Sequence, residues 1–436
     1  MKFQQKQPRA LGSRRVPASL YPGTSLNVSV RLAVHFDWRI GILRIISFSN
    51  GLLAAFLCLT ISAVAQPNPA AVAAPSPSPT PAAAPAPPPP PPHTWSVGSL
   101  DFSGLIDGYY SYNANRPSNA ANGQINDLYD FNDKTDQFSL AMAEVDITHA
   151  PSPVGATVDL IFGRANAIMH SATDKNTDNY IEQAYISATP PKWHGTEIDF
   201  GQFVTSAGAE VIEADNDWNY SRSLLFAWAI PFYHFGLRTS TPVTKSWTAG
   251  VQVVNGWNNV VNNNGGVTIG LTSLYTKPKF NWALNYYVGP ENNDTQKGYR
   301  NLIDTTINLT PTPKFSAYIN YDYGQNRTVA SGEMPEDSAH WQGFAIDTLY
   351  QATAHSSFSA RGEFFDDNQG FATGTTQKVK EVTGTYQYKW AHGLETRVEV
   401  RHDWSNVPFF HKGDAAMVDG QTTATVGFIA FFGPKY

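Results

Sequence analysis

The sequence predicts an all-β protein, a transmembrane antiparallel up-and-down β-barrel of about 16 strands, within a range of about 14 to 18. Three observations predict it. Apolar and polar residues alternate along most of the chain after residue 98, an apolar stretch of signal-peptide length lies near the N-terminus, and the last segment ends in an aromatic residue. Together these features are typical of a barrel that is exported to, and inserted in, an outer membrane.

The alternation is complete in residues 394–404, LETRVEVRHDW. Apolar residues occupy most of one parity there, and charged or polar residues occupy the other. Only a β-strand separates two such sets completely, because successive side chains point to opposite faces. A tilted strand needs roughly 9 to 11 residues to cross the hydrocarbon, and segments of that length recur. We therefore expect apolar side chains outside, against lipid, and polar side chains inside, against water.

Sixteen segments carry this pattern. They are Leu100–Tyr112, Ala141–Ala150, Thr157–Ile168, Tyr180–Ala188, Thr196–Val204, Phe232–Ser240, Ser246–Gly256, Val267–Thr276, Phe280–Gly289, Asn301–Leu309, Phe315–Tyr323, Trp341–Tyr350, Ser357–Phe365, Lys378–Trp390, Leu394–Trp404 and Thr422–Phe432. Long and short connections alternate between them, as extracellular loops and periplasmic turns do. The apolar parity switches near Phe138–Met142, which predicts a bulge.

Composition excludes several other classes. Aromatic residues make up 13% of the chain and charged residues only 15%. Mean hydropathy is −0.30, and no part of the chain after the leader is an apolar run long enough for a spanning helix. The one cysteine, Cys58, lies in the apolar N-terminal stretch, so no thiol chemistry is expected in the mature protein.

The N-terminal region divides into two parts before the barrel. Residues 1–65 are an N-terminal extension and signal peptide, whose apolar core ends in the small residues of a cleavage site between Ala65 and Gln66. Residues 66–97 are a Pro/Ala-rich linker that cannot form a core, and residues 98–436 are the barrel. Removing residues 1–65 takes away eight basic residues and one acid, which changes the formal charge from −6 to −13. An acidic mature chain argues against nucleic-acid binding.

The C-terminal segment predicts a partner. Phe428, Phe432 and the final Tyr436 share one parity of the last strand. An apolar face with a terminal aromatic residue is the signal that the barrel-assembly machinery recognises, so we expect that machinery and outer-membrane lipid as partners.

Strand number also predicts function. A barrel of about 16 strands leaves a water-filled lumen, whereas about eight strands would fill their own interior. The acid-rich connection Ser206–Ser223 is the candidate constriction, with Glu210, Glu213, Asp215 and Asp217 facing a basic wall of Arg361, Arg397 and Arg401. An ordinary solvated external loop is the alternative for this connection, and the sequence leaves both open. The charged ladder at 395–401 also fits cross-strand pairs that stabilise the wall.

No motif for a catalyst, a cofactor or a metal is present. Acids and an amide gather in the first long loop, at Asp127, Asp130, Asn132, Asp133 and Asp136. Their spacing does not match an EF-hand, so we interpret the loop as solvated. His402 has the apolar parity next to Trp404, which favours a residue of the interfacial belt. We expect no cofactor and no metal.

Four stretches resemble the OmpL-like family of outer-membrane β-barrel porins: 130–145, 149–155, 180–185 and, most specifically, 200–236. The resemblance covers roughly Leu100–Tyr436 and excludes the leader and the linker. It implies an outer-membrane barrel that acts as a channel, without a particular substrate. It also makes Ser206–Ser223 a family feature, with a shared role in the lumen or in subunit contact.

The sequence therefore predicts a porin of the bacterial outer membrane, a water-filled channel for passive diffusion of small hydrophilic solutes or ions. A homotrimer is expected, since barrels of this size commonly form trimers. Two other classes stay open: an outer-membrane barrel enzyme of the lipase or protease type, and a periplasmic β-rich binding protein with an N-terminal membrane anchor.

Overall fold

The computed structural model describes residues 95–170, 180–328, 337–390 and 393–434. The predicted signal peptide, its cleavage site between Ala65 and Gln66, most of the predicted linker and the C-terminal Tyr436 lie outside these residues. Phe428 and Phe432 lie within them, and both are exposed on the last strand.

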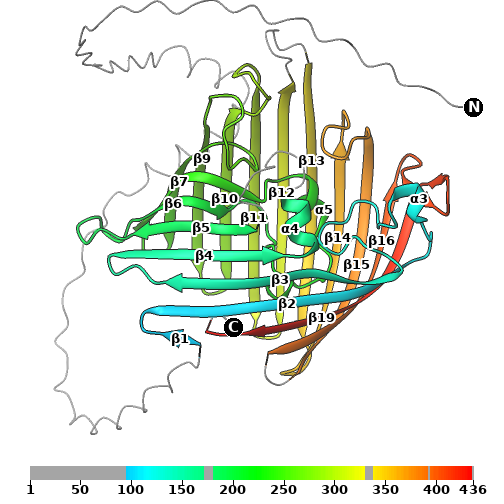
Figure 1. Ribbon diagram of the computed structural model, residues 1–436, viewed down its shortest axis with the longest axis horizontal. Helices are drawn as coiled ribbons and strands as arrows, with labels where there is room; N and C mark the ends of the chain where they lie inside the picture. The colour runs from blue at the N-terminus through cyan, green and yellow to red at the C-terminus, as the bar shows by residue number, and fades with distance from the viewer. Residues whose placement is uncertain (1–94, 171–179, 329–336, 391–392, 435–436) are drawn as a thin grey trace, which may run out of the picture. The chain divides into compact units, whose positions relative to one another are not determined.

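Antiparallel hairpins run in chain order around a closed ring (Figure 1). Each strand pairs with its neighbour in sequence, and the last, β19 (Gly420–Phe432), pairs with the first full strand, β2 (Leu100–Asn113). Sixteen strands of the described chain make this ring, which confirms the predicted fold and strand number. A short β1 (Ser96–Val97), at the end of the predicted linker, pairs with the start of β2.

The remaining ring strands are β3 (Gln137–His149), β4 (Val154–Phe162), β5 (Ile181–Ala188), β6 (Glu197–Val204), β7 (Tyr233–Thr244), β8 (Trp247–Val254), β9 (Thr268–Lys277), β10 (Phe280–Pro290), β11 (Tyr299–Thr312), β12 (Phe315–Thr328), β13 (Asp337–Gln351), β14 (Ser356–Asp367), β15 (Gln377–Trp390) and β16 (Leu394–Ser405). Outside the ring are the hairpin β17 (Phe410–Lys412) and β18 (Ala416–Val418), and the helices α3 (Asn119–Asn122), α4 (Arg164–Met169), η1 (Ala214–Asn216) and α5 (Leu224–Trp228).

The outer face is apolar, as the alternation predicted. On β16, Leu394, Val398, Val400 and Trp404 are exposed, while Glu395, Arg397, Glu399, Arg401 and Asp403 are buried. Other strands repeat this outward set, with exposed Ile106, Val145, Ile186, Phe200, Leu271, Phe344, Ile346, Phe358, Val382 and Phe428. His402 is partly exposed and packs its ring 4.1 Å from that of Trp404. In a folded chain this outer surface requires a hydrocarbon environment.

Two local predictions have clear outcomes. The bulge near Phe138–Met142 is confirmed, because the pairing of β2 with β3 shifts register between Asp107 and Gly108 and leaves Ala141 without an opposite residue. The predicted strand Thr157–Ile168 is wrong in its second half. The strand β4 ends at Phe162, and after Gly163 the chain turns into α4, which buries Ala165 and Met169 in the interior cluster.

Among the described residues, no helix has both the length and the apolar composition needed to cross a membrane. The few helices are short and belong to the connections.

Candidate functional site

The connection between β6 and β7, residues 205–232, is the candidate site and is called the inner loop below. It includes η1 and α5, and α5 lies within the outline of the ring in Figure 1. Most residues from Asn219 to Phe226 are buried against the inner faces of distant strands. The solvated external loop considered above is therefore wrong for this connection.

The helix α5 has a local reason to begin where it does. Ser223 is its N-cap, and its hydroxyl accepts a hydrogen bond from the Phe226 amide at 3.0 Å. The Leu224 amide donates to Glu363 of β14 at 2.6 Å, so a wall carboxylate lies at the positive end of the helix. Leu225 packs over Gly343 of β13, where a β-carbon would lie 2.2 Å from its side chain.

The wall beneath the inner loop is a ladder of charges on β14, β15 and β16. Arg361 pairs with Glu363 at 2.7 Å and with Glu381 at 3.2 Å. Arg397 pairs with Glu395, and Arg401 with Asp403, each at 2.8 Å. The side chains of these three arginines are 0% exposed. Cross-strand and same-strand pairs thus form a network that the inner loop covers.

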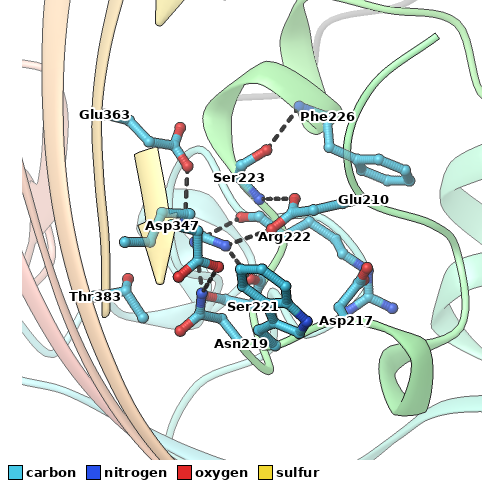
Figure 2. A network of polar contacts seen from close by, with 12 residues as sticks. Glu210, Asp217, Asn219, Ser221, Arg222, Ser223, Phe226, Asp347, Glu363 and Thr383 are labelled. Carbon is cyan, nitrogen blue, oxygen red and sulfur yellow. Dashed lines mark hydrogen bonds and ion pairs between the residues drawn. The ribbon is translucent and has the colours of Figure 1, made fainter. Parts of the chain in front are cut away.

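The three wall arginines hold the inner loop by its backbone carbonyls. Figure 2 shows the loop residues Asn219, Ser221, Arg222 and Ser223 beside Asp347 and Glu363 of the wall. Arg361 donates to the carbonyl of Ser221 at 2.8 Å, Arg397 to that of Asn219 at 2.8 Å, and Arg401 to that of Arg222 at 2.8 Å. Charge-assisted bonds of this kind are about twice as strong as neutral ones. Three residues of the stretch 219–222 are therefore fixed to three arginines of the wall.

The carboxylates hold the same stretch by its amides. Glu399 accepts from the Tyr220 amide at 2.6 Å and from the Ser221 amide at 3.0 Å. Glu210, within the loop, accepts from the Ser223 amide at 2.6 Å. The network contains more carboxylates than guanidinium groups, and these amides supply the missing donors. The backbone from 219 to 224 is thus bound on both its acceptor and its donor sides.

Two loop side chains reach further strands. The Asn219 amide donates to Asp347 of β13 at 2.6 Å, and its oxygen accepts from Ser359 at 3.0 Å and from Thr385 at 2.8 Å. The Tyr220 hydroxyl donates to Asp107 of β2 at 2.6 Å. The inner loop therefore spans from the β13–β16 wall to the first full strand.

The predicted constriction residues lie in or beside this network. Glu210 contacts Arg361 at 2.7 Å, so one predicted acid meets the predicted basic wall directly. Asp217 pairs inside the loop with Arg222 at 3.0 Å. Arg397 and Arg401 bond to loop carbonyls and to wall acids.

Glu213 and Asp215 are partly exposed, unlike Glu210 and Asp217. Burial, followed by the nearby charges of Glu213 and Glu395, raises the pKa of Asp215 to about 6, and Arg397 opposes this effect. Asp215 is therefore an acid that changes charge near neutral pH.

The sequence assigned no docking role to the residues that hold the loop in place: Asn219, Tyr220, Arg222, Glu363 and Glu399. The acidity of residues 206–223, the charged ladder at 395–401 and the resemblance at 200–236 marked these stretches, but none of them assigned a contact. Asn219, Tyr220, Glu363 and Glu399 have partners more than 100 positions away in the chain, where no local pattern points. The side chain of Arg222 bonds within the loop.

The first long loop is not solvated, so that interpretation is wrong. Asp127, Asp130, Asn132 and Asp133 are buried. Asp133 accepts two bonds from Arg164 of α4, at 2.8 and 2.5 Å, and Asp127 pairs with His411 at 3.0 Å. Burial raises the pKa of Asp130 to about 7. The loop folds inward and packs Phe131 against Phe226 of α5.

Two overlapping groups of acids lie close together on the wall formed by β3, β4 and β5. They are Glu144 with Glu182 and with Glu213 of the inner loop, and Glu144 with Asp146 and Asp159, with ligand atoms within 4.8 Å. Each of these side chains already has an interaction partner. Clustered acids are common without a metal, so we assign no metal to them.

Residues 99–432 match the family described as "Putative beta-barrel porin-2, OmpL-like". The chain belongs to this family. The predicted resemblance is thereby confirmed, and the protein is a porin of the bacterial outer membrane, a channel-forming barrel. A comparison of the sequence with curated proteins found no match.

Three solved structures have a similar fold. An anion-selective porin from Comamonas acidovorans has 10% identity and a TM-score of 0.51, covering 77% of this porin and 99% of that chain. OmpF of Salmonella typhi in complex with daunomycin has 13% identity and a TM-score of 0.51, and the match covers 76% of this porin and 97% of that chain. OmpT of Vibrio cholerae, expressed in the outer membrane, has 12% identity and a TM-score of 0.50, and the match covers 77% of this porin and 99% of that chain. At these identities the likeness shows the fold alone.

Proposed function

We propose that this porin is a narrow passive channel whose size limit is set by the inner loop docked on the β13–β16 wall. The observation that carries this proposal is the double attachment of residues 219–224, whose amides bond to Glu399, Glu210 and Glu363 while their carbonyls bond to wall arginines. A segment bound so densely narrows the lumen permanently instead of acting as a mobile lid.

The charged residues divide into two roles in this proposal. Glu210, Asp217, Arg361, Arg397 and Arg401 are buried and paired, so they hold the loop in place. Glu213 and Asp215 keep contact with water, so they give the constriction its negative side and a preference for cations. The acids and the basic wall predicted from the sequence then produce a weaker electric field across the channel than the number of charges suggests, because the charges of the buried pairs cancel.

Loop replacement tests the size limit. Residues 207–222 are replaced by a short Gly-Ser linker, and planar-bilayer conductance is measured with neutral polymers of rising size. We expect higher conductance and entry of larger polymers than in the unaltered porin. An unchanged cut-off would remove the inner loop from the pore.

Charge replacement tests the two roles. Glu213→Gln with Asp215→Asn is expected to lower cation preference in reversal-potential measurements at unchanged single-channel noise. Glu210→Gln is expected to increase noise, because it breaks the bonds to Ser223 and Arg361. Equal selectivity in all variants would contradict the assignment of Glu213 and Asp215.

We also propose that the protein has no enzymatic activity of its own. The carboxylates and arginines of the candidate site are used to hold backbone groups, which supports a structural use of these charges. Hydrolysis of phospholipid or peptide by the purified protein, abolished by a substitution within the barrel, would overturn this.

We propose that the protein forms a homotrimer. In this trimer the side of the barrel with the shortest strands, which we call the low wall, forms the subunit contact. The strands β5, β6 and β8 have 8 residues each, against 14 in β11, β12 and β15. Eight residues tilted by about 45° rise only about 19 Å, less than the hydrocarbon thickness of about 30 Å. Contact between low walls would relieve this mismatch.

Matched alanine variants test the trimer. Phe200→Ala changes an exposed residue of the low wall, and Phe344→Ala an exposed residue of the tall strand β13. We expect Phe200→Ala, but not Phe344→Ala, to lower the fraction of trimer on native gels. A monomer in the unaltered protein would refute the proposal.

A further inference from the structure

A cavity of about 180 Å³ lies at the end of the barrel that carries the long connections, and we call it the Arg300 pocket. Its lining includes Trp228 of α5, Trp257 of the β8–β9 connection, Arg300 at the start of β11, Trp341 of β13 and Phe371 of the β14–β15 connection. Five separate parts of the chain thus converge on one small space.

The pocket combines one cation with stacked rings. The guanidinium carbon of Arg300 lies 4.8 Å from the ring centre of Trp257 and 5.1 Å from that of Phe371. Trp341 stacks on Phe371 at 5.1 Å with an interplanar angle of 12°, and meets Trp257 edge-on at 6.1 Å. Ring faces that flank a guanidinium keep it planar and leave its edge to bind a ligand.

The rings are fixed before any ligand arrives. The Trp341 indole donates to the carbonyl of Ala229 at 3.1 Å, which ties the pocket to the inner loop. The Phe371 amide donates to Asp367 at 2.9 Å, and the Trp257 amide to Glu291 at 2.9 Å. A pocket that is already ordered spends little binding free energy on reorganisation.

Arg300 differs from the arginines beneath the inner loop. Its Nε donates to Asn326 at 3.1 Å, and among the described residues no carboxylate lies within 4.0 Å of its guanidinium nitrogens. Glu291 is nearby, but it bonds to the Trp257 amide and the Thr268 hydroxyl. The two terminal amino groups of Arg300 therefore suit a carboxylate, which binds a guanidinium through two parallel bonds.

We propose that the Arg300 pocket binds small organic anions that carry a carboxylate and a single aromatic ring, at the entrance of the channel. A cavity of about 150 Å³ holds benzene, so this space accepts one ring next to the carboxylate. The consequence for transport rests on the proposed channel, since bound anions would be concentrated at its entrance. Binding itself does not require conduction.

Fluorine NMR of the refolded barrel in detergent tests binding directly, with 4-fluorobenzoate as the probe. We expect its signal to broaden, and Arg300→Gln to weaken the affinity at least about tenfold, since a charge-assisted bond is lost. Arg300→Lys keeps the charge but lacks the planar edge, so its affinity should lie between that of the unaltered protein and that of Arg300→Gln. Arg116→Gln is the matched control, because Arg116 also lies over a ring, that of Tyr112, outside the pocket.

Two neutral or smaller probes define the ligand class. 4-Fluorobenzyl alcohol lacks the charge and fluoroacetate lacks the ring, and both should bind at least about tenfold more weakly than 4-fluorobenzoate. Equal binding of 4-fluorobenzoate to Arg300→Gln, with barrel folding verified by heat-modifiable gel mobility, would overturn the proposal. Equal affinity for fluoroacetate would overturn the aromatic part. Binding without conductance would instead count against the channel and leave the pocket intact.

Discussion

The hydroxyl of Tyr220 lies 2.6 Å from a carboxylate oxygen of Asp107, although 113 positions separate the two residues. Tyr220 belongs to the inner loop between β6 and β7, and Asp107 to β2, the first full strand of the ring. The ring of Tyr220 reaches Asp107 by passing over Gly427 of β19. This bond extends the attachment of the inner loop from the β13–β16 wall past β19 to β2, which follows directly in the order of the ring.

Gly427 is therefore a sensitive position. A β-carbon there would lie 2.4 Å from the Tyr220 ring, and an aromatic ring cannot bend away. We expect Gly427→Ala to destabilise docking of the loop by about 1 to 3 kcal/mol, the usual cost of overpacking. Hydrogen exchange of the peptide 219–226, followed by mass spectrometry, should show faster exchange. Gly384→Ala on β15 is the control, since nothing lies within 4 Å of its added carbon.

Glu399 is the residue whose loss should release the backbone. In Glu399→Gln the amide nitrogen would face an N–H of Tyr220 or Ser221, so at least one bond is replaced by two opposed donors. Loss of a hydrogen bond to a charged group costs about 1.5 to 3 kcal/mol. We expect larger current fluctuations in single-channel recordings. Glu197→Gln, at the far end of β6, should behave like the unaltered protein, and equal noise in both variants would contradict the role of Glu399.

The loop should be held more firmly in mild acid. Because the pKa of Asp215 is raised from 3.8 to about 6, the folded state binds its proton more tightly than the unfolded chain does. This contribution to stability is therefore lost as pH rises through about 6. After correction for the intrinsic rise of exchange with pH, we expect lower protection of the loop amides at pH 8 than at pH 5, and a smaller difference in Asp215→Asn. Asp414→Asn, in the β16–β19 connection, should retain the full difference.

Val400 tests the outer face. It is exposed midway along β16, on the face that an outer-membrane barrel turns to hydrocarbon. We expect Val400→Arg to destabilise the inserted barrel by about 2 to 4 kcal/mol, measured by urea unfolding in lipid vesicles. Val261→Arg, at an equally exposed valine of the β8–β9 connection, should leave the unfolding midpoint unchanged. A comparable loss in both variants would show that the effect is not due to lipid.

The ring of strands could be predicted from the sequence because its cause is local. Each strand separates its own residues into two faces, so Val398 and Glu399 take opposite sides without any knowledge of their neighbours. Turn lengths then fix which strand pairs with which. The prediction extended β4 too far, because a short apolar run does not distinguish a strand from a buried helix. In the structure Gly163 and α4 follow the strand.

The sequence by itself determined that Glu395, Arg397, Glu399 and Arg401 point inward, and that residues 206–223 carry unusual acidity. Only the tertiary structure decided that these wall charges are covered, and that they bond to the backbone of the inner loop instead of to water. It alone also brought Arg300 between Trp257 and Phe371. The physical reason is that alternation acts between adjacent residues, whereas docking depends on closing the ring, which brings together groups more than 40 to more than 170 positions apart.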